Sequence, residues 1–116
     1  MTGLQSLENA LTKLQGHAAV DVGLRKVLAP LRAYDAKRGT DLVKTLVVFI
    51  QLGGNITAAA DKLFLHRNSL AYRLQRIEEL CGLDVREARL RYLLTTALSL
   101  ADPRLFKEFN IEGGHR

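Results

Sequence analysis

The chain is poor in the residues that build disulfide frameworks and metal clusters. It has 116 residues with one cysteine, two prolines and no tryptophan, and only 6% of it is aromatic. The lone thiol, Cys81, excludes an intramolecular disulfide and a multi-cysteine zinc site. No apolar run approaches the length of a membrane span, and Met1 is not followed by a basic and then apolar leader. These absences favour a protein of the reducing cytoplasm with no membrane contact.

The usual signatures of enzymes are also missing. His17, His66 and His115 lack the spacing of a metal cluster. Gly53-Gly54 has no following lysine, so it is not a phosphate-binding loop. No serine, histidine and acid grouping is suited to nucleophilic catalysis. We therefore expect neither an enzyme nor a cofactor.

Basic residues are in excess. The chain has 17 Lys+Arg against 12 Asp+Glu, which gives a formal net charge of +5. A basic surface suits a polyanionic partner such as nucleic acid. The length and the 47% hydrophobic content fit one soluble domain with a modest core.

The apolar residues recur with helical spacing almost throughout, which predicts an all-α bundle. Pro30 lies inside the second helical pattern and predicts either a kink or a later start there. His17 to Val22 is predicted to be a connector, and Cys81 a buried thiol on an apolar helix side. The expected helices cover residues 4–14, 24–34, 42–52, 56–63, 67–80 and 86–100, with a last turn after Pro103 and a frayed tail at 112–116.

The helix over 42–52 carries the widest apolar stripe and is predicted to be central. Either Thr40 or Asp41 is expected to cap its first amides. The glycine pair at Gly53-Gly54 is expected to end it. Asn55 or Thr57 then caps the following short helix.

Residues 54–80 have the layout of a helix-turn-helix. Ala59 and Ala60 are small enough for the close crossing of the two helices. On the second helix, Leu70, Leu74 and Ile77 share one side, while polar and basic residues share the other. No acidic residue occurs from 66 to 76, as expected for a helix that enters a groove lined by phosphates.

The run GGNITAAADKLFLHRNSLAYRLQRIEELCGLDV resembles the C-terminal helix-turn-helix of PucR/CdaR-type bacterial transcriptional regulators. The resemblance covers about residues 24–101 and is most specific in H-R-N-S-L followed by Y-R-L. The same segment is similar to the DNA-binding helices of Fis. It implies a regulator that binds operator DNA, usually as a dimer, within the bacterial cytoplasm and nucleoid.

The sequence departs from the family pattern in three respects. Ala71 stands where many members carry arginine, and Phe64 occupies a turn position where smaller residues are common. Family members also carry upstream regions that sense a metabolite, and we expect such a region to be absent here. The predicted organisation is an N-terminal helix and connector (1–22, a linker or dimerisation element), the DNA-binding domain (23–102) and a C-terminal turn and tail (103–116).

Two residues are the candidates for reading bases. Arg67 begins the second helix of the motif, and an arginine fork can bind guanine O6 and N7. A phosphate contact or a local salt bridge is the alternative for Arg67. Asn68 either pairs with adenine or caps its own helix.

The other candidates suit the DNA backbone. Ser69 and Tyr72 are predicted to contact phosphate oxygens, which set register rather than sequence. Tyr72 could instead pack on a thymine methyl. His66 either caps the helix or touches a phosphate, and Arg73 either forms a structural ion pair or binds DNA. The remaining predicted phosphate contacts are Arg76 and, with the free amides of its helix, Thr57.

Two further questions stay open at this stage. The leucines at positions 4–14 could serve dimerisation or cover the bundle. A helical protein-interaction module without DNA contact is the main rival function. RNA binding is a second rival, although no aromatic platform for stacking single strands is present.

Overall fold

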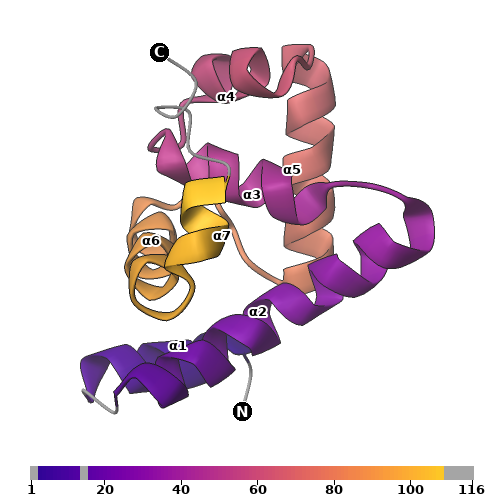
Figure 1. Ribbon diagram of the computed structural model, residues 1–116. Coiled ribbons are helices and arrows are strands. Elements are labelled where there is room, and N and C mark those ends of the chain that lie inside the picture. Colours follow the sequence, from indigo (N-terminus) through magenta and orange to yellow (C-terminus); the bar gives the residue numbers. More distant parts are fainter. Residues whose placement is uncertain (1–2, 14–15, 109–116) are drawn as a thin grey trace.

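Seven helices form the part of the computed structural model that is described, which is residues 3–13 and 16–108 (Figure 1). That part contains no strand, so the predicted all-α class is confirmed. None of its helices combines the length and apolarity that a membrane crossing requires. In chain order the helices are α1 (Gly3–Thr12), α2 (His17–Arg38), α3 (Leu42–Gln51), α4 (Ile56–Leu63), α5 (Arg67–Cys81), α6 (Ala88–Ala101) and α7 (Pro103–Glu108).

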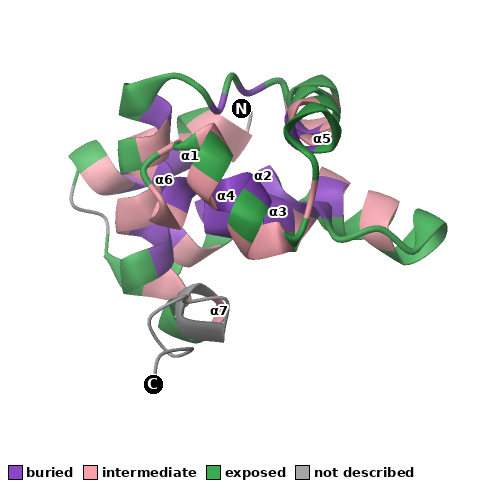
Figure 2. Cartoon of the chain, turned by 90° about the horizontal axis from the view of Figure 1, so that it is seen from above, coloured by how far each residue is buried: buried purple, intermediate pink, exposed green. Residues whose placement is uncertain are grey.

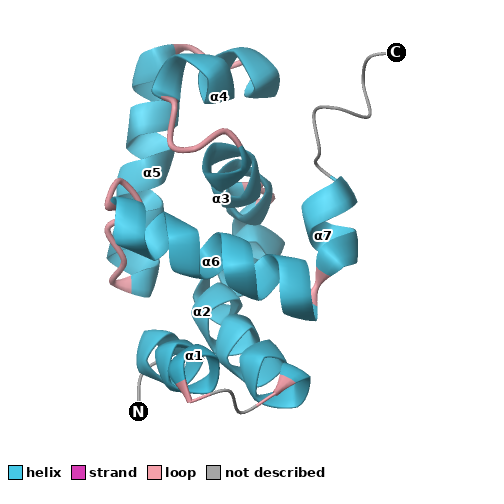
Figure 3. Cartoon of the chain, turned by 90° about the vertical axis from the view of Figure 1, so that its left-hand side faces the viewer, coloured by secondary structure: helices cyan, strands magenta, loops and turns pink. Residues whose placement is uncertain are grey.

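Helix α3 lies at the centre of the bundle, as its wide apolar stripe predicted. It contacts α2, α4, α5 and α6, and it sits among them in Figures 1 and 3. The polar residue Thr45 is buried with it, and its hydroxyl donates to the Asp41 carbonyl at 2.9 Å. The buried residues of α3 are Leu42, Thr45, Leu46, Val47, Val48, Phe49 and Ile50.

Helix α2 begins earlier than the sequence predicted. It runs without interruption from His17 to Arg38, so the predicted connector at 17–22 is wrong, and so is a start shifted by Pro30. Val20 is buried, and it extends the apolar stripe toward the N-terminus. A Cβ on Gly23 would lie 2.7 Å from the Leu7 Cα, so the missing side chain allows α1 to cross closely. The packing of α1 thus stabilises the first turns of α2.

The leucines of α1 cover the bundle. Leu7 is fully buried, and Leu4 and Leu11 are partly buried against the core. Leu14 lies outside the described residues. Of the two interpretations of this stripe, packing within the chain is the one that the structure shows.

The cap of α3 comes from the preceding helix. Asp41 occupies the N-cap position, but its side chain makes no capping hydrogen bond, so neither it nor Thr40 is the cap. The Asp35 carboxylate accepts hydrogen bonds from the amides of Leu42 at 2.7 Å and Val43 at 3.0 Å. The Thr40 hydroxyl also donates to Asp35. Asp35 therefore links the end of α2 to the first turn of α3.

We expect Asp35→Ala to lower the free energy of unfolding by about 1–2 kcal/mol, because two first-turn amides lose their acceptor. Urea unfolding of the variant and of the wild type measures this difference. The matched control is Asp61→Ala, which removes an exposed aspartate of α4 that makes no side-chain hydrogen bond to the described residues. Equal stability of the two variants would contradict the capping role.

The C-terminal helices follow the prediction with small shifts. Helix α6 begins at Ala88 rather than at 86, because the Asp84 side chain accepts a hydrogen bond from the Arg86 amide in a turn. The predicted last turn is the short helix α7, which Pro103 begins. The tail predicted at 112–116 lies outside the described residues.

Cys81 is a partly buried thiol. Its Sγ donates to the Val27 carbonyl at 3.5 Å. Burial raises the pKa of Cys81 to about 11. Little thiolate forms at neutral pH, so the group is poorly suited to redox sensing.

Candidate nucleic-acid interface

Helix α4 is held against the bundle by its alanine pair. Ala59 and Ala60 are buried on a helix that contacts α3 and α5, as the motif predicted. The Asn55 side chain accepts a hydrogen bond from the Ala58 amide at 3.0 Å. Asn55 is therefore the cap, and Thr57 is left exposed in the first turn of α4.

The turn between α4 and α5 is tight and strained. Phe64 adopts a left-handed backbone with φ of 56°, which is costly for a residue with a side chain. Its ring is 95% exposed, so packing within the chain does not offset that cost. The Leu65 amide donates to the Ala60 carbonyl at 2.9 Å and closes the turn. Leu63 packs against the core, and the two helices are thereby fixed relative to each other.

The first turn of α5 presents free polar side chains. The His66 Nδ1 accepts a hydrogen bond from the Asn68 amide at 3.1 Å, so His66 is the N-cap. Arg67, Asn68 and Ser69 are exposed. Within the described part of the chain, their side chains make no hydrogen bond or ion pair. Three adjacent groups are therefore available to a partner.

The two sides of α5 differ as the sequence predicted. Leu70, Leu74 and Ile77 are buried against the bundle. Tyr72 is 60% exposed on the other side. Figure 2 shows exposed residues on the outer side of α5, away from the core. Among the described residues, packing does not occlude the side of α5 that is predicted to read DNA.

Arg73 ties α5 to the start of α3. Its guanidinium forms an ion pair with Asp41 and donates to the Thr45 hydroxyl at 3.4 Å. The structural ion pair, one of the two interpretations of Arg73, is therefore present. A DNA contact by Arg73 stays a prediction.

Arg76 is held by neighbouring side chains. It donates to the Tyr72 hydroxyl at 2.8 Å and pairs with Glu79 at 3.1 Å. Its guanidinium also lies 5.8 Å from the centre of the Tyr34 ring. The hydrogen bond with Tyr72 raises the pKa of Arg76 above its ordinary value. These contacts fix Arg76 in place beside the exposed side of α5.

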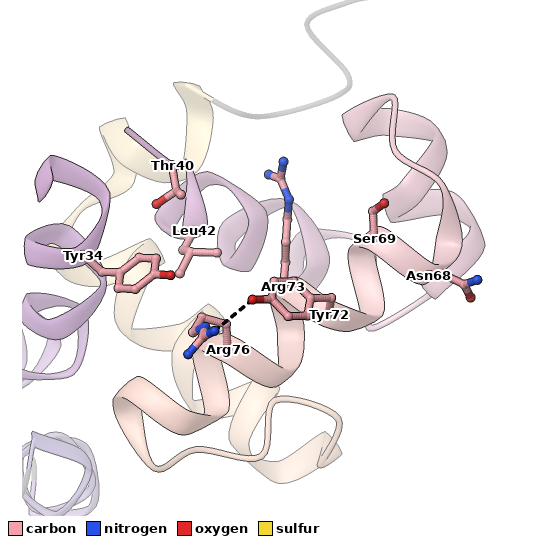
Figure 4. A pocket seen from close by; sticks show the side chains of 8 residues that line it. All are labelled: Tyr34, Thr40, Leu42, Asn68, Ser69, Tyr72, Arg73 and Arg76. Carbon is pink, nitrogen blue, oxygen red and sulfur yellow. Dashed lines mark hydrogen bonds between the residues drawn. The ribbon is translucent and has the colours of Figure 1, made fainter. Parts of the chain in front are cut away.

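A groove of about 530 Å³ runs between the end of α2 and the outer side of α5 (Figure 4). In Figure 4 a dashed line marks the hydrogen bond between Arg76 and Tyr72, and the Arg73 side chain extends from α5 toward its partners at the start of α3. The sequence alone does not identify the wall formed by α2 and α3, because Tyr34 and Leu42 occupy positions of helical apolar spacing, which predicts burial in the core and not a groove wall. The groove is lined by Tyr34, Thr40, Leu42, Asn68, Ser69, Tyr72, Arg73 and Arg76.

The predicted site residues thus fall into three groups. Thr57 lies on α4, whereas the other predicted residues lie on α5 or at its N-cap. His66, Arg67, Asn68 and Ser69 form the first turn of α5 and its cap. Tyr72, Arg73 and Arg76 follow on α5 and line the groove. In the described residues, no three histidine, cysteine or acidic side chains lie close enough together to hold a metal.

Known proteins resemble this chain over the same segment. Residues 42–100 match the PucR C-terminal helix-turn-helix domain. The Escherichia coli carbohydrate diacid regulator is 41% identical over 81 residues, which are 70% of this chain and 20% of that protein. The Bacillus subtilis proline-responsive transcriptional activator PutR is 37% identical over 75 residues, which are 65% of this chain and 18% of that protein.

The matches cover the helix-turn-helix region of this chain and only a small part of each relative. The chain spans about a fifth of the length of the curated relatives it matches. No solved structure matches the chain. The match over 42–100 covers α3 to α6, which are the central helix, the two helices of the motif and the closing helix. The chain therefore belongs to the PucR family and carries that family's C-terminal helix-turn-helix domain.

Proposed function

We propose that the chain binds duplex DNA as part of a transcriptional regulator and reads the major groove with the start of α5. The observation that carries this proposal is that Arg67, Asn68 and Ser69 are exposed and have no side-chain partner among the described residues, on a helix whose other side is buried. A rigid helix with free donors at its N-terminal end is what major-groove readout requires. Two names among the relatives, an activator and a regulator, support the same function.

The roles of the side chains follow from their positions. Arg67 and Asn68 contact base edges, Arg67 at guanine and Asn68 at adenine. Ser69 and Tyr72 contact phosphates and set the register. Thr57, next to the free amides of α4, contacts a phosphate on the other side of the motif.

His66, Arg73 and Arg76 act in support of these contacts. His66 caps α5 through Nδ1, which leaves its second ring nitrogen for a phosphate. Arg73 and Arg76 line the groove, where Asp41 and Tyr72 hold their guanidinium groups in place for a phosphate contact. We assign no reaction to this chain, and we place it in the bacterial cytoplasm.

A single motif of this size contacts few bases, so we propose that two copies bind a palindromic operator. Two-fold symmetry would place the paired reading helices about 34 Å apart, one turn of the duplex. Phosphate contacts would supply much of the affinity and make it strongly dependent on salt.

Selection of bound duplexes from a random pool tests the proposal. We expect enrichment of a palindrome whose half-sites are about 10 base pairs apart, centre to centre. Light scattering of the complex with that duplex then gives the number of chains bound. A pool that stays random, together with no measurable affinity for duplex DNA or duplex RNA at the same salt, would favour the protein-interaction module instead.

A further inference from the structure

The C-terminal end of α2 projects beside the reading helix. Figures 1 and 2 both show it extending past α5, on the side away from α6. Its last turn carries Lys37 and Arg38, both exposed, and Gly39 ends the helix in a left-handed conformation. The end of α2 and the exposed side of α5 form the two walls of the groove of about 530 Å³.

Two guanidinium groups lie over one aromatic ring in this groove. Arg38 is 5.5 Å from the centre of the Tyr34 ring, and Arg76 is 5.8 Å from it. Contact with the ring orients a cation, but it leaves the positive charge in place. The Tyr34 ring thus joins the basic end of α2 to the basic side of α5.

The acidic residues near this groove already have partners. Asp35 accepts hydrogen bonds from the first amides of α3, Asp41 pairs with Arg73, and Glu79 pairs with Arg76. Across residues 3–13 and 16–108, no carboxylate pairs with Lys37 or Arg38. Their charges are therefore free to bind an anion from outside the chain.

We propose that Lys37 and Arg38 bind phosphates of the DNA strand that borders the major groove occupied by α5. This inference rests on the proposed function. The major groove is about 12 Å wide, so a helix inserted in it has a phosphate backbone on either side. The end of α2 stands beside α5 with two unpaired cations, and the opposite charge of the backbone complements it. Lys37 and Arg38 are then a second contact, which adds affinity without reading sequence.

The test compares two double variants on the duplex recovered by selection. K37Q/R38Q removes the two proposed contacts, and R25Q/R32Q removes the same charge from exposed positions earlier on α2. Fluorescence anisotropy at several salt concentrations gives the slope of log K against log salt. We expect K37Q/R38Q to reduce the magnitude of this slope by about 1.8 relative to wild type, since each lost phosphate contact contributes about 0.9. R25Q/R32Q should leave the slope close to that of wild type.

The ratio of specific to non-specific affinity distinguishes a phosphate contact from a base contact. We expect K37Q/R38Q to weaken both affinities by the same factor and to keep their ratio. Replacing single phosphates of the duplex by neutral methylphosphonates should weaken wild type at the bordering strand and leave K37Q/R38Q unaffected there. If the double variant does not fold, the single variants R38Q and K37Q give the same comparison with an expected slope change of about 0.9 each.

The outcomes distinguish a failure of the α2 contact from a failure of the proposed DNA-binding function. If wild type shows no preference for any duplex, the proposed function fails. If wild type binds its selected duplex and K37Q/R38Q has the same salt slope as R25Q/R32Q, the function stands and the α2 contact is refuted. In that case Lys37 and Arg38 serve only to complement the negative end of the α2 dipole, and K37Q/R38Q would lower stability without changing the salt slope.

Discussion

Arg67→Ala is expected to weaken binding to the selected duplex by about 1–3 kcal/mol, which is roughly a 5- to 150-fold rise in Kd. The side chain is exposed at the first position of α5, and no group of the described chain competes for it. The variant should therefore lose a DNA contact without losing an internal one. Its free energy of unfolding should change by no more than about 0.5 kcal/mol.

Arg67→Lys is the matched control for charge. Lysine keeps the positive charge but lacks the planar fork that binds two acceptors of guanine. Affinity for random duplex should stay near that of wild type, while affinity for the selected duplex should fall nearly as far as in Arg67→Ala. Both are measured by anisotropy at one fixed salt concentration. An unchanged Kd for Arg67→Ala would mean that the start of α5 does not read the bases.

The segments that the sequence predicted well are those with local signals at both ends. The range of α4 was predicted correctly because Asn55 caps its first turn and the turn that follows is short. The end of α5 followed from Gly82, which adopts the left-handed conformation expected of a helix end. Helix α3 was identified as central because nearly every residue between Leu42 and Ile50 is apolar.

Features that depend on distant parts of the chain were not predictable in this way. The first turns of α2 are stabilised by α1, which crosses at Gly23, and no local pattern reveals that contact. The cap of α3 lies seven residues before Leu42, on another helix, so the residues that flank α3 suggest Thr40 or Asp41 instead of Asp35. Both errors concern neighbours in space that are not neighbours in sequence.

In the candidate site, too, local features were predictable and tertiary contacts were not. The exposure of Asn68 followed from helical periodicity, and that of Arg67 from its position at the start of α5. The partners of the longer side chains did not, because Arg76 reaches a ring on α2 and Arg73 an aspartate before α3. The groove between α2 and α5 arises from this tertiary packing, and its α2 wall was therefore missed.

The largest effect on stability is expected on α3, the central helix of the bundle. Phe49 is 1% exposed, and its helix contacts both α4 and α5. Phe49→Ala removes a buried ring and leaves a cavity, which should lower the free energy of unfolding by about 3–5 kcal/mol. Urea unfolding measures the change, with the slope of the transition as a check that both proteins unfold in two states.

Phe64→Ala is the control, because it deletes the same ring at a site that is 95% exposed. Its expected change in unfolding free energy is within about 0.5 kcal/mol. A loss in Phe49→Ala no larger than that in Phe64→Ala would show that α3 is not the packing centre. A domain of this size is stable by about 5–15 kcal/mol. The loss expected for Phe49→Ala should therefore leave a measurable fraction of the molecules unfolded at growth temperature. Because the unfolded fraction has no ordered α5, Phe49→Ala should lose DNA affinity as that fraction grows with temperature, although Phe49 itself is too deeply buried to touch DNA.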